Sequence, residues 1–550
     1  MSASSKKMLR KEQNAAAMTE KQLQEQKEAK KLRRYTAAFA FAIVAMILVV
    51  VFSRVSSSGI IPRSTTALTV GGTKVSAAEL NHYYIDSVNN FLNSYGDYVS
   101  MFGLDTTKAL DDQFYNEAEK QTWSDYFLDT ATASAQNMYA IYNEAKANGF
   151  TMSDESKASI DATVENMALY ATMYGFSSPD AYIAAMYGEG CNEKTFRQYA
   201  EVQMTAQEYT AAKSEELTYD DAALRAEDEK NPAAYSAFTY NSYYLANSTF
   251  YQGGTEDEEG NKTYSDEEKE AGRAAAEAAA NSLLTATNAA ELDAAIAALE
   301  VNAESTTAKS TRNEKLQYAN LPTVLSSWVT ASERKAGDIA VIPNESTTHN
   351  HAEGEECTGD DGTTVVNGYY VVLFEGKDDN LTELVNVRHI LVSFEGGTTD
   401  ETTGTTTYSE DEKKVAENAA ATILAAFQEG KQSEETFAEL ATKNTDDPGS
   451  KENGGLYENV YPGQMDSAFN DWCFGSARKP GDTGIVETEY GYHVMYFVGN
   501  SGMTYRDFMI ESTLRNADLT AWETALIEGA ELVVSNTKFI KTDLTLSSSN

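Results

Sequence analysis

The feature that most constrains the fold of this chain is an internal repeat at a spacing of 144 residues. Residues 263–269 read TYSDEEK and residues 407–413 read TYSEDEK. Residues 328–338 (WVTASERKAGD) and 472–482 (WCFGSARKPGD) recur at the same spacing. Two separate blocks at one spacing are hard to reach by chance, and self-similarity at a fixed period is typical of a duplicated unit. The chain is therefore expected to hold two copies of one module.

These copies are expected at 231–380 and 381–500, and each should mix strands with helices. In the second copy, VRHILV (387–392) and YHVMYFV (492–498) have the β-branched and aromatic content of strands. Helical patterns fill the sequence between them. Strands at both ends with helices between them predict an α+β module, so the fold class of the whole chain is α+β.

The first helix of the second copy carries a clear start signal and an apolar stripe. Ser409 and Glu412 have the spacing of a capping box, which starts a helix. Apolar residues then recur at i, i+4 spacing. The pattern predicts a helix that ends at Gly430 and buries four residues: Val415, Ala419, Ile423 and Phe427.

Residues 35–53 contain no charged side chain and include the run AAFAFAIVAMILVVVF. About 20 apolar residues suffice for a helix to cross a bilayer. Residues 1–34 carry ten Lys and Arg against four Glu, so the positive-inside rule places this basic tail in the cytoplasm. We predict a single N-terminal transmembrane helix through the lipid bilayer of the cell membrane, with a linker at 54–65 and the bulk of the chain extracytoplasmic. A cleaved signal peptide is the alternative.

The chain that follows the tail is strongly acidic, because the whole sequence has a net charge of −41 in spite of its basic start. Nucleic-acid binding needs clustered Lys and Arg for the phosphates, so nucleic acid is not expected as a partner. The three cysteines, Cys191, Cys357 and Cys473, are far apart and odd in number. They predict no disulfide framework.

Residues 66–230 are rich in Ala, Tyr and Met and are expected to form an all-α domain, with a helix break at Gly188–Gly190. Residues 501–550 return to a helical pattern and are expected to pack back onto it. The Met and Tyr residues have two interpretations. They are either ordinary core residues or an adaptable apolar cradle for unfolded chains, because Met repacks easily.

The second copy resembles the parvulin family of peptidyl-prolyl isomerases over most of its length. The motifs that carry the resemblance occur in family order and at family spacing: RHILV (388–392), FAELA (437–441), TDDPGS (445–450), NGG (453–455), GQM (463–465), RKPGD (478–482) and GYH (491–493). The resemblance implies a four-stranded sheet with surrounding helices and a shallow proline-binding cleft. The whole layout is similar to the SurA/PrsA type of exported foldase, with a helical chaperone domain and parvulin modules.

The resemblance also assigns site residues position by position. It implies that the catalytic residues are His389, Asp447, Thr488 and His493. It implies that the substrate-binding residues are Leu391, Tyr457, Met465, Phe469 and Tyr490. Tyr457 falls where the family usually has Leu, so that wall of the pocket is altered. The alternative for the two histidines is that they are merely buried core residues bonded to each other.

Prolyl isomerisation asks for no metal and no cofactor, because no bond is broken. Amide resonance opposes rotation with a barrier of ~18–20 kcal/mol. Lowering that barrier by about 4 kcal/mol speeds the rotation roughly a thousandfold. His349, His351 and Cys357 invite a metal interpretation, but they fall in a Gly/Thr/Glu-rich stretch without a fourth ligand at fixed spacing, so a solvated loop is expected.

The first copy lacks the residues that the resemblance makes catalytic. Tyr370 takes the place of His493, and Tyr243 or Leu245 takes the place of His389. Ala303 lies near the place of Asp447. This degenerate module is therefore expected to be catalytically inactive and to serve in binding or as a spacer.

Three functions are compatible with these patterns. The main hypothesis is an anchored foldase that binds unfolded, newly exported, proline-containing polypeptides and isomerises their X–Pro bonds. A non-catalytic holdase or scaffold, in which both modules only bind peptides, is the main alternative, and the altered wall at Tyr457 argues for it. A cell-surface adhesin built from repeated domains is the third. The oligomeric state is not decided by the sequence, and a homodimer stays open.

Overall fold

The computed structural model describes residues 4–8, 46, 59–256, 261–299, 309–349, 362–400, 402–475 and 478–541. The chain divides into two compact units: one comprises the sequence up to Thr218 and from Asn516 onward, and the other comprises Tyr219–Arg515. The predicted basic tail and transmembrane helix lie outside the described residues apart from 4–8 and 46. Among the described residues, no helix is both long enough and apolar enough to span a bilayer.

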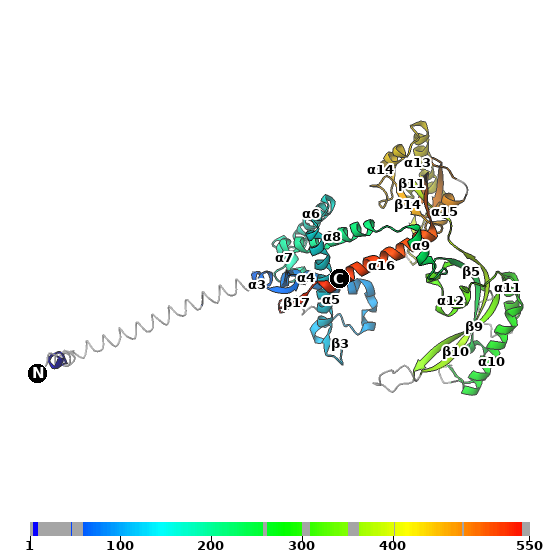
Figure 1. Ribbon diagram of the computed structural model, residues 1–550, viewed down its shortest axis with the longest axis horizontal. Helices are drawn as coiled ribbons and strands as arrows, with labels where there is room; N and C mark the ends of the chain where they lie inside the picture. Colours follow the sequence, from blue (N-terminus) through cyan, green and yellow to red (C-terminus); the bar gives the residue numbers. More distant parts are fainter. Residues whose placement is uncertain are drawn as a thin grey trace. The chain divides into compact units, whose positions relative to one another are not determined.

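The first unit is built around three long helices, α4 (Ala77–Tyr95), α5 (Trp123–Ala147) and α8 (Glu193–Glu216) (Figure 1). Each begins with a side-chain cap on the backbone N–H three residues on, which satisfies a donor that the helix leaves open. The core between them contains large, fully buried aromatic residues such as Trp123 and Phe127. The other helices of the unit are α3 (Ile60–Ser64), α6 (Asp154–Met173) and α7 (Pro179–Tyr187).

A small sheet shows that the prediction of an all-α domain is wrong in part. Strands β1 (Thr66–Val70) and β2 (Thr73–Ser76) form a hairpin, and β17 (Leu532–Val534) pairs antiparallel with β1. The hairpin turns at Gly71 and Gly72, whose φ angles of 53° and 86° favour glycine. Its apolar residues close one side of the helical core. A second hairpin pairs β3 (Phe114–Asn116) with β4 (Gln121–Thr122).

The long helix α16 (Tyr505–Gly529) begins in the second unit, and its later turns belong to the first. Within the first unit, Trp522 and Leu526 pack with Ile141 and Tyr209. The chain then continues into β17 and the buried Ile540. The C-terminal segment is thus part of the core of the first unit.

The second unit contains two four-stranded antiparallel sheets with the same order of strands. The first sheet runs β8-β5-β10-β9 and the second runs β14-β11-β16-β15, which is the order second, first, fourth, third along the chain in both. The strands of the first sheet are β5 (Ala237–Ala246), β8 (Thr311–Gln317), β9 (Ile339–His349) and β10 (Gly362–Asp378). Those of the second are β11 (Glu383–Ser393), β14 (Leu456–Val460), β15 (Thr483–Thr488) and β16 (Gly491–Thr504).

Helices cover both faces of the second sheet. On one face, α13 (Glu410–Glu429) and α14 (Glu434–Asn444) pack on β11 and β16; on the other face, α15 (Ser467–Phe474) covers β15 and its neighbours (Figure 1). The first sheet is accompanied by α10 (Asp266–Ser282), α11 (Ala289–Ala297) and α12 (Thr323–Val329), and α9 (Asp221–Asp228) precedes it.

The capping box at Ser409 and Glu412 forms as predicted, but the buried stripe of α13 is different. Ala416, Ala420 and Phe427 are buried, whereas Val415 is 70% exposed. Small alanine side chains let the helix lie close to the sheet, so this face turns inward although Val415 is more apolar. The prediction that Val415 and Ala419 are buried is wrong for that reason.

The stretch predicted as a loop in the first module is partly regular. Strands β9 and β10 pair antiparallel from Ile339 and Leu373 out to His349 and Gly362. The chain up to His349 therefore belongs to a long hairpin rather than to a solvated loop. His351 and Cys357 lie outside the described residues, as does Ala303.

Candidate active site

The two central strands of the second sheet bring His389 and His493 together. In the register of β11 and β16, His389 lies opposite Met495 and Leu391 lies opposite His493. The histidines are thus diagonal neighbours, and the alternation of side chains along a strand places both on the face covered by α15. Their Nδ1 atoms are 3.0 Å apart, and both side chains are buried.

The TDDPGS turn carries Asp447 to the other edge of His389. The hydroxyl oxygen of Thr445 accepts the backbone N–H of Leu391 at 3.1 Å and that of Asp447 at 3.2 Å. The backbone N–H of Asp446 donates to the carbonyl of Leu391 at 2.9 Å. These bonds tie the turn to β11, and they leave Asp447 Oδ2 2.9 Å from Nε2 of His389.

The NGG motif also contacts strand β11 beside His389. The backbone N–H of His389 donates to the carbonyl of Gly455 at 2.8 Å. A Cβ atom on Gly455 would lie 2.2 Å from the carbonyl oxygen of His389, and Gly455 has a φ of 75°. Both the close approach and the left-handed backbone demand glycine at this position.

The polar side chains form one hydrogen-bonded chain. The ionised Asp447 at one end of it determines which nitrogen of each histidine carries the proton. Because an ionised Asp447 can only accept, His389 donates to it from Nε2 and keeps Nδ1 as an acceptor. His493 therefore donates from Nδ1 to His389, and its Nε2 accepts the hydroxyl proton of Thr488 at 2.9 Å. The oxygen of Thr488 accepts the backbone N–H of Tyr490 at 3.2 Å. Both imidazoles are thus neutral, each with one assigned tautomer.

Burial and hydrogen bonding set the charges of this chain. Burial by itself would raise the pKa of Asp447, but hydrogen bonds from Ser450, His389 and further donors outweigh it and lower the pKa to about 2. Burial lowers the pKa of His389 in spite of the nearby carboxylate. Burial and the neighbouring His389 lower the pKa of His493 to about 4. At neutral pH the site holds one carboxylate and two neutral imidazoles.

The aromatic ring of Phe469 and the thioether side chain of Met465 lie beside the histidines. The ring of Phe469, on α15, meets His389 edge-on with centroids 5.6 Å apart and meets His493 at 5.5 Å. Met465 is partly buried in the same cluster, and Leu391 is half-buried on the strand between the histidines. The side chain of Tyr490 is 61% exposed, so its described contribution to the site is its backbone N–H.

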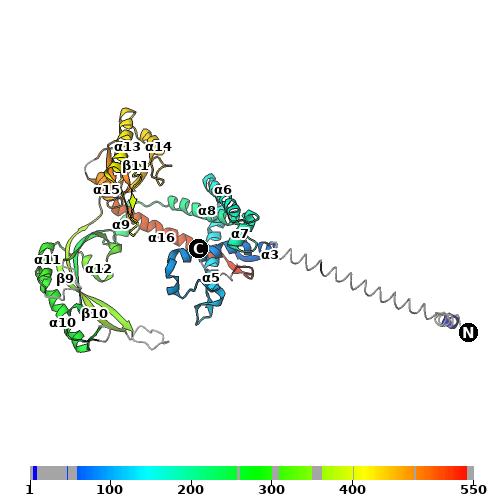
Figure 2. The ribbon, with the colours of Figure 1, turned by 180° about the vertical axis from the view of Figure 1, so that it is seen from behind.

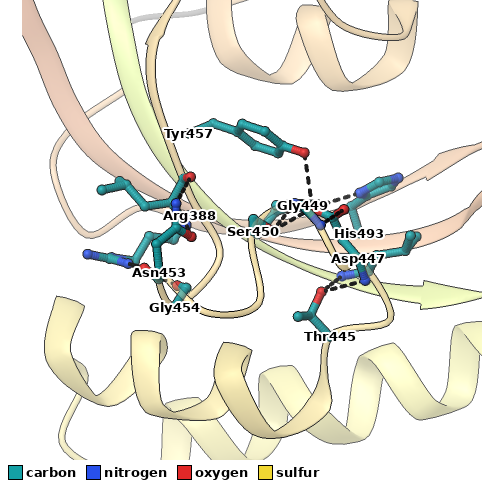
Figure 3. A network of polar contacts seen from close by, with 12 residues as sticks. Arg388, Thr445, Asp447, Gly449, Ser450, Asn453, Gly454, Tyr457 and His493 are labelled. Atoms are coloured by element: carbon teal, nitrogen blue, oxygen red, sulfur yellow. Dashed lines mark hydrogen bonds and ion pairs between the residues drawn. The ribbon is translucent and has the colours of Figure 1, made fainter. Parts of the chain in front are cut away.

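Two residues take roles that sequence reasoning missed. The Tyr457 hydroxyl donates to Asp447 Oδ2 at 3.0 Å, and its ring lies 4.9 Å from that of His389, so it joins the polar chain as well as lining the pocket (Figure 3). The buried hydroxyl of Ser450 also donates to Asp447 Oδ2. Ser450 closes the TDDPGS block, so its place in that motif was the available signal.

Two known protein families match parts of this chain. Residues 369–499 match the family described as the PPIC-type PPIase domain. The chain carries a parvulin-type PPIase domain. Residues 29–210 match the SurA-like N-terminal domain, so the pair of domains is PrsA/SurA-like. The resemblance drawn from the sequence motifs is confirmed at this level.

The curated relatives with a similar sequence are foldases. Foldase protein PrsA 1 of Listeria innocua is 38% identical over 64 residues, which cover 12% of this chain and 22% of the relative. Foldase protein PrsA 1 of Listeria monocytogenes is 33% identical over 95 residues, which cover 16% and 32%. The chain thus spans less than a third of the length of these two relatives.

Solved structures of PrsA proteins also match part of the chain. The peptidylprolyl isomerase PrsA of Bacillus anthracis is 21% identical, with 28% of this chain and 59% of that chain covered and a TM-score of 0.17. PrsA of Bacillus subtilis is 24% identical, with 27% and 49% covered and a TM-score of 0.18.

The first sheet holds different residues at the places of the parvulin-type site. If GYY (368–370) is aligned with GYH (491–493), Tyr370 takes the place of His493 and lies opposite Tyr244. Ser242, opposite Val372, takes the place of His389. The prediction of Tyr243 or Leu245 at that place is wrong, because a shift by an odd number of residues turns a strand over. Both face the opposite side, in the cluster with α10 and α11.

Proposed function

We propose that the parvulin-type domain of this chain isomerises X–Pro peptide bonds in unfolded polypeptides outside the cytoplasm. The observation that carries the proposal is the buried pair of neutral histidines, with assigned tautomers, directly against the Phe469 ring. A pyrrolidine ring fits beside such an apolar wall. The relatives named foldase protein PrsA support a folding role.

The mechanism needs stabilisation of a twisted amide rather than bond cleavage. A twisted X–Pro amide loses its conjugation, so a site that binds the twisted form better than the planar form lowers the barrier. In this proposal Phe469 and Met465 hold the proline ring, with Leu391 and Tyr490 at the margin. The chain from Thr488 through His493 and His389 to Asp447 keeps the polar floor of the site rigid, because each member orients the next.

The helical unit has surface suited to binding unfolded chains. Large apolar side chains are exposed at the end of α6 and on α7: Leu169 is 66% exposed, Met173 66%, Tyr174 67% and Met186 50%. Clustered exposed apolar residues of this kind indicate an interaction surface. We propose that this patch, which we call the α6–α7 patch, contacts client polypeptides, and that Met side chains let it adapt to different sequences.

The remaining parts of the chain fit an anchored foldase. We propose that residues 35–53 anchor it in the membrane as a single span, with the basic tail in the cytoplasm. We also propose that 231–380 is a degenerate copy of the module at 381–500, because the two sheets share one strand order and two sequence blocks repeat. With Tyr370 and Ser242 at the places of the histidines, that copy would bind peptide or act as a spacer.

The test is prolyl isomerisation of a short Xaa-Pro peptide by the full-length chain, with the double variant His389→Ala/His493→Ala alongside. The proposal expects activity in the unmodified chain and its loss in the variant. Val392→Ala, on the same strand but on the opposite face, serves as the matched control and should keep most of the activity.

The alternative is a holdase without catalysis, and the same preparations decide it. Absence of isomerisation above background, together with suppressed aggregation of a denatured client, would favour the holdase. The structure weakens the sequence argument for this alternative, since Tyr457 is bonded into the polar chain instead of disrupting it.

A further inference from the structure

The first unit contains a cavity that the isomerase site does not use. It has a volume of about 400 Å³, and its lining residues lie on α4, α5, α6 and α8. Helices α5, α6 and α8 are labelled in Figure 2. This volume falls within the ~300–1,000 Å³ typical of ligand pockets. The cavity therefore has room for a side chain or a short peptide segment.

One carboxylate lies in the cavity without a positive partner. Asp86, on α4, accepts a hydrogen bond from the hydroxyl of Tyr199 on α8. None of the fourteen described residues that line the cavity is Lys or Arg, and no ion pair of Asp86 occurs among the described residues. Burial raises the pKa of Asp86, although the hydrogen bond from Tyr199 acts in the opposite direction.

The rest of the lining donates and accepts hydrogen bonds but carries no charge. Its polar side chains are amides and hydroxyls, such as Asn90, Ser134, Gln203 and Gln207. An anion would find no cation in this lining. A hard metal ion would find a single carboxylate, whereas such ions gather several oxygen ligands. An organic cation with hydrogen-bonding neighbours is the class of ligand that the lining fits.

We propose that this cavity receives a lysine or arginine side chain of an unfolded polypeptide, with Asp86 as its counter-ion. The inference rests on the proposed function, since it deepens how the helical unit binds its clients. Helix α6 connects the two features: Ile160 and Thr163 line the cavity, and Leu169 and Met173 belong to the α6–α7 patch. A client segment with basic and apolar residues would use both.

The experiment compares two labelled, proline-free unfolded peptides that differ only at one central residue, lysine in one and norleucine in the other. Their affinities for the full-length chain are measured by fluorescence anisotropy. The lysine peptide should bind about tenfold more tightly than the norleucine peptide. In Asp86→Asn, which keeps the size of the side chain and an acceptor for Tyr199, this ratio should fall to about one. Because both peptides are measured on one preparation, partial unfolding of the variant cancels in the ratio.

The matched control is Glu165→Gln, which removes the same charge from an exposed position on α6. It should leave the ratio near ten. A ratio that stays near ten in Asp86→Asn, or that is already near one in the unmodified chain, would overturn the inference. If neither peptide binds, the client-binding part of the proposed function fails with it. Isomerisation of a short Xaa-Pro peptide, measured on the unmodified chain, tests the catalytic part separately.

Discussion

At the scale of single residues, Asp447 organises the site, because it accepts hydrogen bonds from three side chains. His389, Ser450 and Tyr457 all donate to its Oδ2 atom. These donors hold the carboxylate ionised, and the ionised carboxylate selects the tautomers of both histidines. Removal of one donor to Asp447 should therefore affect the hydrogen bonds of both histidines.

Tyr457→Phe removes one donor to Asp447 and keeps the ring beside His389. A hydrogen bond to a charged group contributes about 1.5 kcal/mol or more, so kcat/KM should fall roughly tenfold. The pKa of Asp447 should rise from about 2, because the carboxylate loses a donor. Tyr492→Phe is the matched control, because Tyr492 also donates to a carboxylate, Glu487, but away from the site. Equal losses in both variants would contradict the role of Tyr457.

The buried histidines predict a direction for the pH dependence. The pKa of His493 is lowered from 6.5 to about 4. Between these pH values, His493 is protonated in the unfolded chain but neutral in the folded site. Stability therefore falls as the pH drops from 6.5 to 4, by about 3 kcal/mol from this residue. Below about pH 3.8, protonation of Asp447 in the unfolded state lowers the stability further, because the pKa of Asp447 in the folded state is about 2.

The check is an NMR titration of the imidazole Cε1 protons together with the pH–rate profile. His493 should stay neutral down to about pH 4, and activity should be level above about pH 5. A His493 signal that titrates near pH 6.5 would contradict the buried neutral chain. His82 in the first unit, whose pKa burial lowers to about 3, is an internal reference for a buried histidine.

At the scale of elements, the site depends on how closely the NGG turn approaches β11. Gly455→Ala should lower both stability and isomerase activity, because the added Cβ would meet the His389 carbonyl oxygen at 2.2 Å and push the strand aside. Gly404→Ala is the control: Gly404 also has a positive φ, 69°, but a Cβ there meets no atom within 4 Å. The control should cost only about 1 kcal/mol of backbone strain and keep full activity. Thermal unfolding and kcat/KM measure both variants.

At the scale of the whole molecule, two units share the chain, so damage to one should spare the other. Truncation after Ala530 removes β17 and the buried Ile540 from the first unit. Loss of one buried Ile side chain costs about 1.5–3 kcal/mol, so the first unit should unfold at a lower temperature. Isomerisation of a short peptide should be unchanged, because the site lies in the second unit. A parallel loss of both would show that the units are not independent.

The features that the sequence determined by itself are local structures and family motifs. The capping box at Ser409, the strands around His389 and His493, and the family of the domain could all be read from short patterns, because each depends on neighbouring residues. The polar contacts of Tyr457 and Ser450 depend instead on where a turn folds against a distant strand. The exposed Val415 and the buried Ala416 depend on how closely a helix can approach a sheet.

The tertiary structure alone decided the remaining features, and in each case because partners meet that are far apart in sequence. Strand β17 pairs with β1, although most of the sequence lies between them. No local pattern within 66–230 could predict this pairing. Ser242 rather than Tyr243 or Leu245 takes the place of His389, because only paired strands reveal register. Asp86 lies in a cavity among four helices, and its lack of a positive neighbour is a property of their packing.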